Sequence, residues 1–141
     1  MYLPDINVWL ALAFPSHKHH NPARTWFGGS PTARSCHFCR LTQMGFLRLA
    51  NNPSVFPQAA LTQDQAWKLY DLTMSSPRVE FAVEPPTLET ILRQFTQFPR
   101  FAPNNWNDAY LAAFAVAGSY ELVTFDKGFA QYAGLAVTIL P

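Results

Sequence analysis

The alternation of short strand-like segments with longer helical ones is the feature that most constrains the fold of this chain. The predicted strands are residues 2–5, 34–37, 79–83, 121–124 and 136–140, most of them rich in apolar and β-branched residues. The predicted helices are residues 6–14, 40–50, 62–75, 87–95 and 106–118. A further helix is predicted to begin at Pro22 and to end at the Gly-Gly-Ser-Pro cluster of residues 28–31. This order predicts an α/β fold with a parallel sheet covered by helices on both faces.

Local signals mark where several of these helices begin. Pro22 suits the first turn of a helix, because proline lacks the amide hydrogen that would go unused there. Thr62 and Gln65 have the spacing of a capping box, and Thr87 can cap the helix that follows it. Each of these positions agrees with the boundaries predicted from apolar periodicity.

The composition is that of one globular domain, residues 1–141. Apolar residues make up 49% of the chain, which supplies a full core and argues against disorder. Charged residues make up only 13%, so an apolar partner surface is a hypothesis to test. No apolar run is long enough to span a bilayer, and acidic Asp5 stands where a signal peptide would be basic, so we expect a cytoplasmic protein. The net charge of +1 neither indicates nor excludes nucleic acid.

Three aspartates follow strands or open a helix in positions where ligands collect in parallel sheets. Asp5 ends the first predicted strand, Asp126 follows the strand at 121–124, and Asp108 lies at the start of the helix at 106–118. Clustered carboxylates repel one another unless a cation compensates them, and hard oxygen ligands favour Mg²⁺ or Mn²⁺. The pattern predicts metal-assisted hydrolysis of a phosphodiester by an activated water.

Each aspartate also has a purely structural interpretation. Asp5 could cap the first helix, Asp126 could be a turn residue, and Asp108 could complete a cap begun three residues earlier at Asn105. A cap and a metal ligand are compatible, because one carboxylate oxygen can face the helix while the other faces an ion.

Four segments, in order, resemble the motifs of PIN-domain ribonucleases of the VapC toxin type. They are Leu-Pro-Asp-Ile-Asn-Val-Trp-Leu at 3–10, residues 38–49, residues 107–113 and Thr-Phe-Asp at 124–126. The resemblance extends over nearly the whole chain. It implies a three-layer α/β/α sandwich around a parallel sheet, Mg²⁺ or Mn²⁺ at the acidic pocket, RNA as substrate, a small antitoxin protein as partner, and a homodimer.

Gln43 departs from the family pattern, in which many members carry glutamate. A glutamine oxygen can contact a cation or its water, but it brings no charge and cannot act as a carboxylate base. We therefore expect Gln43 to support the catalytic pocket, and we expect one firmly held ion, with a second recruited together with RNA phosphate.

Other polar residues can assist the three aspartates. Asn7 and Thr124 could orient carboxylates or waters around the ion, although residues at strand ends also satisfy local backbone groups. The candidates to contact RNA phosphate are Arg40, Arg48 and Lys127, each of which could instead be a solvated surface charge.

Three alternatives to a nuclease site remain open at this level. Gln43 makes a catalytically weak or inactive PIN-like module that binds RNA or protein plausible. A zinc site could use the cluster of His17, His19 and His20 or the Cys36-His37-Phe38-Cys39 segment, and the two cysteines could also form a redox pair. The aromatic residues of the first two helices could form a partner groove or could fill the core; they are Trp9, Phe14, Trp26 and Phe27.

Overall fold

Five parallel strands form the central sheet of the computed structural model, which describes residues 1–29 and 32–141. The strands are β1 (Tyr2–Pro4), β2 (Cys36–Phe38), β3 (Val79–Phe81), β4 (Glu121–Thr124) and β5 (Val137–Ile139). Their order across the sheet is β3-β2-β1-β4-β5, which places β1 at the centre. Every neighbouring pair is parallel, and Leu3 of β1 lies opposite Leu122 of β4.

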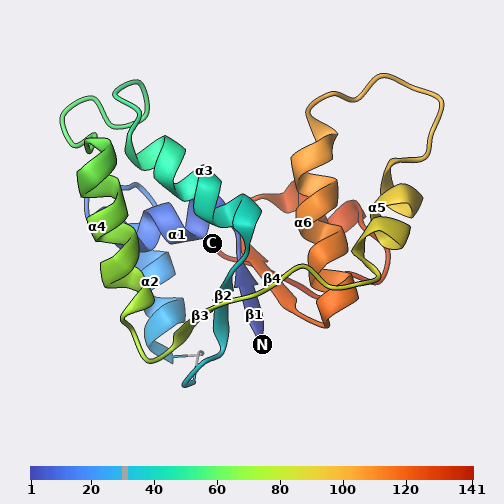
Figure 1. The fold of residues 1–141 in the computed structure, drawn as a ribbon, viewed down its shortest axis with the longest axis horizontal. Helices are drawn as coiled ribbons and strands as arrows, with labels where there is room; N and C mark the ends of the chain where they lie inside the picture. The colour runs from blue at the N-terminus through green and yellow to red at the C-terminus, as the bar shows by residue number, and fades with distance from the viewer. Residues whose placement is uncertain (30–31) are drawn as a thin grey trace.

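Helices cover both faces of this sheet (Figure 1). They are α1 (Ile6–Ala13), α2 (His20–Gly29), α3 (Arg40–Ala50), α4 (Gln63–Met74), α5 (Leu88–Thr96), α6 (Asn105–Gly118) and the short 3-10 helix η1 (Lys127–Gln131). Side chains of α1 to α4 form one core with one face of the sheet, and those of α5, α6 and η1 form a second core with the other. The predicted three-layer α/β/α architecture is confirmed.

Local sequence signals account for most helix boundaries. The capping box at Thr62 and Gln65 is present, with the Gln65 amide donating to the Thr62 hydroxyl at 3.3 Å and the Thr62 amide donating to Gln65 Oε1 at 2.9 Å. α3 begins and ends at the predicted residues. Thr87 occupies the N-cap position of α5, but its side chain makes no capping hydrogen bond.

Some predicted boundaries were wrong. The second strand begins at Cys36 rather than at residue 34, because Arg34 adopts a left-handed backbone with φ 56°, which no strand accommodates. α2 begins at His20, before the predicted start at Pro22. The predicted terminator of α2 includes Ser30 and Pro31, which lie outside the described residues.

The aromatic residues of the first two helices belong to the core. Trp9 is fully buried, stacked on Phe38 with ring centroids 3.9 Å apart, and Phe14 stacks on Phe56 at 4.0 Å. Trp26 is also buried, and Phe27 packs against the same core. The core interpretation of these four residues is therefore confirmed. In the described part of the chain, no helix is long and apolar enough to cross a membrane.

A close approach between α1 and α3 fixes the start of α1 beside the sheet. A Cβ atom at Gly45 would overlap the side chain of Ile6, so glycine lets the two helices meet at this point. Ile6 directly follows Asp5, and the contact therefore holds the backbone that carries this carboxylate.

Candidate active site

The three predicted aspartates converge at the carboxyl end of the sheet, next to the point where the strand order reverses. From β1 the chain continues to β2 on one side, while β4 pairs with β1 on the other. Asp5 follows β1 directly and Asp126 lies just beyond β4, so both flank the crevice in which ligands bind in such sheets. Asp108 lies in the first turn of α6.

Asp5 is half-buried, and both of its carboxylate oxygens accept hydrogen bonds. Oδ1 accepts from the Ile6 amide at 2.6 Å, which caps α1, and Oδ2 accepts from the Thr124 hydroxyl at 2.8 Å. Burial raises the pKa of Asp5 from 3.8 to about 6, and the charges of Asp108 and Asp126 contribute to this rise. The three carboxylates are therefore close enough to repel one another.

Asp108 and Asp126 lie on the exposed side of the same cluster. Burial and the charge of Asp126 raise the pKa of Asp108. Asp126 Oδ1 accepts from the Gly128 amide at 2.7 Å and so begins η1, which confirms a turn role for this residue. The capping interpretation of Asp108 is wrong, because the N-cap of α6 is Asn104 and Asp108 is the fourth helical residue rather than the third.

Thr124 connects Asp5, Asp126 and Asn7 through one buried hydroxyl. Besides donating to Asp5, this hydroxyl accepts from the Asp126 amide at 3.0 Å and from Asn7 Nδ2 at 3.2 Å. Within the described residues, Asn7 Oδ1 is buried with no hydrogen-bond partner. A buried acceptor of this kind requires a donor or a cation beside it.

We expect Thr124→Val to raise the pKa of Asp5 above 6 and to lower the free energy of unfolding by about 1–3 kcal/mol. The substitution removes the donor to Asp5 and leaves two N–H groups without their acceptor. NMR titration of the Asp5 carboxyl carbon and urea denaturation measure the two effects. Thr124→Ser keeps the hydroxyl and serves as the control; an unchanged Asp5 pKa in Thr124→Val would show that the hydroxyl does not tune it.

The donor set fits a hard divalent cation that keeps some of its waters. In residues 1–29 and 32–141, no three His, Cys, Asp or Glu side chains converge tightly enough to hold an ion by themselves. Mg²⁺ does not need such a cage, because it binds through one or two carboxylates and retains water. The mutual repulsion of the aspartates and the unpaired Asn7 Oδ1 are what such a hydrated ion would relieve.

Among the described residues, the cysteines are not part of any group of three side chains that could hold a metal ion. Both are free and buried, and burial raises the pKa of Cys36 to about 12 and also raises that of Cys39. Metal binding and thiol exchange both require the thiolate. Of the histidines, His20 lies 2.7 Å from the Ala11 carbonyl oxygen through Nδ1, and His19 stacks on Phe125 with centroids 4.3 Å apart.

Tyr132 is a site residue that the sequence did not indicate. Its hydroxyl donates to Asn105 Oδ1 at 2.7 Å, and its pKa is raised to about 12 by burial and by the charges of Asp108 and Asp126. It comes from the segment after η1, and no spacing in the sequence relates it to the aspartates. Only the folded chain brings it to the acidic cluster.

Gln43 is buried, with partners of its own on α3 and α4. Its Oε1 accepts from Arg40, and a hydrogen bond with Gln43 lowers the pKa of Tyr70, which burial raises overall. Arg40 also lies over the Phe81 ring, 4.9 Å from its centroid. Arg48 on α3 and Lys127 at the start of η1 are both exposed.

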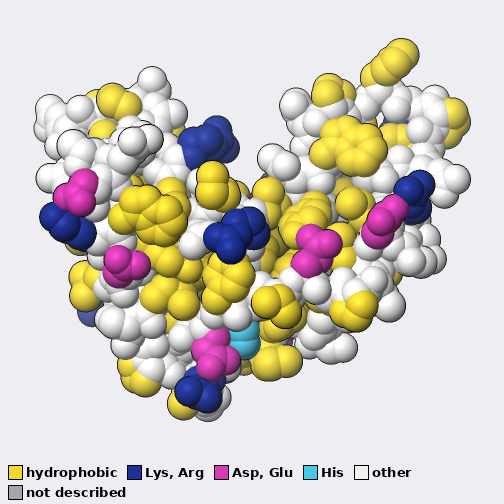
Figure 2. All heavy atoms as spheres, in the orientation of Figure 1, with side chains coloured by type: hydrophobic (Ala, Val, Ile, Leu, Met, Phe, Trp, Pro, Cys, Tyr) yellow, Lys and Arg dark blue, Asp and Glu magenta, His cyan; other side chains and the backbone are white. Residues whose placement is uncertain are grey.

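The molecule is hollowed between the lobe of α3 and α4 and the lobe of α5 and α6, as Figure 2 shows. Basic side chains border the hollow on the side of α3, which carries Arg40 and Arg48. Apolar side chains line much of the remaining surface. A basic border of this kind suits an anionic ligand.

Comparisons with known proteins agree with this architecture. The model of the PIN domain family matches residues 2–135. Ribonuclease VapC41 of Mycobacterium tuberculosis is 42% identical over 144 aligned residues, which cover 99% of both chains, and ribonuclease VapC38 is 31% identical over 91% of this chain and 86% of its own.

Solved structures share the fold at low sequence identity. The M. tuberculosis toxin VapC20, which cleaves the sarcin-ricin loop, superposes with a TM-score of 0.70 over 100% of both chains at 14% identity. VapBC2 from Rickettsia felis, solved with a promoter DNA fragment, superposes with a TM-score of 0.67 over 99% of this chain and 98% of its own, also at 14% identity. From the family match and the 42% identity over its full length, the chain belongs to the PIN-domain family and, within it, to the VapC proteins.

Proposed function

We propose that this protein is a divalent-metal-dependent endoribonuclease that acts as the toxin of a toxin-antitoxin pair. The observation that supports the proposal is the closeness of the three aspartates: the charges of Asp108 and Asp126 raise the pKa of Asp5, and the charge of Asp126 raises the pKa of Asp108. The curated relatives with up to 42% identity are named ribonucleases, which supports RNA as the substrate. Capping accounts for Asp5 and Asp126 individually but not for gathering three carboxylates in one place, because unneutralised repulsion destabilises the folded state.

In this proposal Asp5, Asp108 and Asp126 would hold Mg²⁺ or Mn²⁺, and the buried Asn7 Oδ1, which has no partner among the described residues, would be a further acceptor at the site. When bound, the ion supplies a nucleophile at neutral pH and neutralises charge on the scissile phosphate. Thr124 keeps Asp5 Oδ2 in place, and the Gly128 amide orients Asp126. These fixed hydrogen bonds limit the rearrangement that ion binding requires.

Basic residues of α3 and η1 are the proposed contacts for RNA phosphates. Arg40 and Arg48 extend from α3, and Lys127 directly follows Asp126. An arginine can make two parallel hydrogen bonds to one phosphate, which fixes the register of the strand without reading its bases. We propose that Gln43 acts indirectly, because it accepts a hydrogen bond from Arg40 and so orients this guanidinium.

The proposed protein partner is a small antitoxin. Structures with the same fold include the two-component assemblies VapBC2 from Rickettsia felis and FitAB, each solved on DNA. The exposed apolar residues of this chain, such as Met44 on α3 and Leu72 on α4, are available for a protein contact. A homodimer is the corresponding proposal for the toxin itself.

Removal of the metal tests the activity. The purified protein should cleave total RNA in Mg²⁺ and should not do so in EDTA, and mapping of the cut ends would identify the sequence. Expression should arrest growth, and Asp108→Asn should abolish the arrest, whereas Asp64→Asn, which removes an exposed partner of Lys68, should not. A protein that binds RNA but leaves it uncut in Mg²⁺ would instead be the inactive binding module that Gln43 makes conceivable.

We expect one Mg²⁺ per chain with measurable affinity in the absence of RNA. Three carboxylates and a neutral Gln43 supply less negative charge than four acids, and this charge is too small to retain two ions without phosphate. Isothermal titration calorimetry of the RNA-free protein gives the stoichiometry. Two equally tight sites would contradict the expectation, and Gln43→Glu tests whether an added charge recruits the second ion.

A further inference from the structure

A pocket with aromatic walls adjoins the acidic cluster on the side of α6. It encloses about 380 Å³ between the end of α5, the 97–104 connection and the first turn of α6. Phe101 is fully exposed and Trp106 is 57% exposed, two of the largest apolar side chains left on the surface. A neighbouring pocket of about 430 Å³ along α5 shares Trp106 and Thr96.

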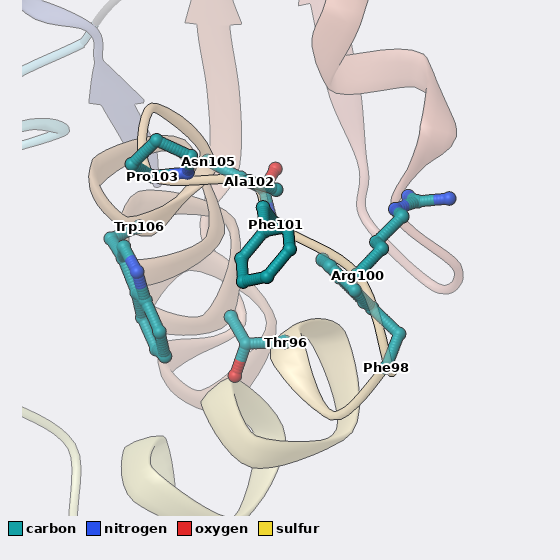
Figure 3. A pocket seen from close by; sticks show the side chains of 8 residues that line it. All are labelled: Thr96, Phe98, Arg100, Phe101, Ala102, Pro103, Asn105 and Trp106. Carbon is teal, nitrogen blue, oxygen red and sulfur yellow. The ribbon is translucent and has the colours of Figure 1, made fainter.

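Figure 3 shows how the side chains lie around this space. The ring of Phe101 lies between Trp106 on one side and Phe98 and Arg100 on the other. The Arg100 guanidinium extends away from Trp106 and has its carbon 4.3 Å from the centroid of Phe98. The Thr96 hydroxyl already donates to the Leu92 carbonyl, so it offers only acceptor capacity. The pocket thus presents aromatic faces and few polar groups.

One hydrogen bond connects this pocket to the proposed active site. Asn105 lines the pocket and accepts the Tyr132 hydroxyl at 2.7 Å. The charges of Asp108 and Asp126 in turn contribute to the raised pKa of Tyr132. Trp106 precedes Asp108 by two residues in the same turn of α6. Side chains two residues apart on a helix point to different faces, so the pocket is connected to the aspartates through the Asn105–Tyr132 pair rather than through Trp106.

We propose that this pocket binds an unpaired base of the RNA substrate, stacked on Trp106 and Phe101, with Arg100 contacting an adjacent phosphate. The proposal rests on the proposed ribonuclease activity and names how the substrate is held. Stacking is available to every base, but only where the base is unpaired, so the pocket selects single-stranded RNA without selecting its sequence.

An arginine without a carboxylate partner beside the aromatic rings favours RNA over another occupant. The chain as a whole carries only +1, so RNA binding needs contacts that do not require charge in addition to the basic residues. Aromatic stacking is such a contact. Among the described residues, Arg100 has no carboxylate within 4.0 Å, in contrast to Arg93, which pairs with Glu89 at 2.7 Å. An unpaired guanidinium at the edge of an aromatic pocket complements a nucleotide better than it complements an apolar protein surface.

Binding of a short oligouridylate tests the proposal, with every protein carrying Asp5→Asn to prevent cleavage. We expect Trp106→Ala to raise the Kd roughly five- to 150-fold, and Trp106→Phe, which keeps an aromatic face, to recover most of the loss. Trp67→Ala is the matched control, because Trp67 is 48% exposed on the opposite lobe; its Kd should not change. A duplex of the same length should bind weakly and should not respond to Trp106→Ala.

Tryptophan fluorescence gives a readout that is independent of affinity. In a Trp67→Phe background, Trp9 and Trp26 are buried and Trp106 is the exposed reporter. Saturable quenching by oligouridylate, absent in Trp106→Phe, is expected from direct stacking. Urea denaturation of each variant verifies that the fold is intact, because exposed residues contribute little to stability.

The outcomes distinguish a failure of the pocket proposal from a failure of the proposed nuclease activity. If the wild-type protein cleaves RNA but Trp106→Ala binds oligouridylate as tightly as Trp67→Ala does, the pocket proposal is wrong and the nuclease stands. If Trp106 is quenched and required for binding in a protein that never cleaves RNA, the pocket stands and the nuclease is wrong. If Trp106→Ala converts a dimer to a monomer in sedimentation and leaves the Kd unchanged, the face is a subunit interface and the pocket proposal is wrong.

Discussion

Asp5→Asn should lower the rate of RNA cleavage by at least about 100-fold, because the loss of a metal ligand should exceed the 10- to 100-fold effect typical of residues behind the ligands. The substitution removes one of three carboxylate charges at the centre of the cluster. It should leave the fold intact, since the asparagine oxygen can accept the Ile6 amide hydrogen as the aspartate does. Single-turnover cleavage of a labelled RNA in saturating Mg²⁺ measures the effect.

Two controls make this result specific to the cluster. Asp64→Asn removes a carboxylate of the same type from an exposed helical ion pair and should leave the rate unchanged. Circular dichroism of both variants tests the integrity of the fold. A cleavage rate in Asp5→Asn within a few-fold of wild type would show that the site of hydrolysis is elsewhere.

The same carboxylate should make the metal-free protein less stable as the pH rises. The folded-state pKa of Asp5 is about 6, above its ordinary value of 3.8. Below pH 3.8 the group is protonated in both states; between 3.8 and 6 the unfolded chain releases the proton and the folded chain keeps it. The unfolded state is thereby favoured, and the free energy of unfolding should fall by about 3 kcal/mol across this window.

Urea denaturation in EDTA at a series of pH values between 3.5 and 7.5, about the window that the shifted pKa defines, measures this loss. The difference between wild type and Asp5→Asn isolates Asp5, because other titrating groups, including His17 with its lowered pKa, are common to both proteins. Addition of Mg²⁺ at pH 7 should stabilise the wild type more than the variant, since an ion that binds the folded state shifts the equilibrium toward it. Parallel curves for the two proteins would show that Asp5 titrates normally.

These two predictions describe one compromise. An ionised, half-buried Asp5 beside two other carboxylates destabilises the apoprotein, and the same arrangement creates the affinity for a cation. Proteins commonly accept such a loss of stability at sites of chemistry.

Much of the fold follows from local features of the sequence. The exact range of α3, the capping box of α4 and the five strand segments depend on residues that are close together in the chain, where periodicity and capping act. The cap formed by Asp5 is equally local, because its partner is the next residue. The errors were local as well: a left-handed Arg34 shortened a strand, and η1 went unpredicted in a segment of five residues.

The site was predictable in part. Parallel strands direct their carboxyl ends to one edge, so Asp5 and Asp126 could be assigned to the same edge without coordinates. Their repulsion, the raised pKa of Asp5 and the role of Thr124 depend on how β1 and β4 align and how deeply the carboxylate is buried. Gln43 illustrates the difference between what the sequence and the folded chain reveal. The sequence showed an uncharged residue at this position, but it did not show that Gln43 has Arg40 and Tyr70 as hydrogen-bond partners.

The sequence by itself determined the class of fold, the order of its elements and the three aspartates, because apolar periodicity and strand-end position are properties of neighbouring residues. Only the tertiary structure decided that Tyr132 and Asn105 join the acidic cluster to an aromatic pocket, and that the thiols of Cys36 and Cys39 are buried with raised pKa values. Those relations join residues far apart in the chain or depend on solvent exclusion by the whole domain. Packing of the two cores against the sheet sets them, and no local pattern encodes that packing.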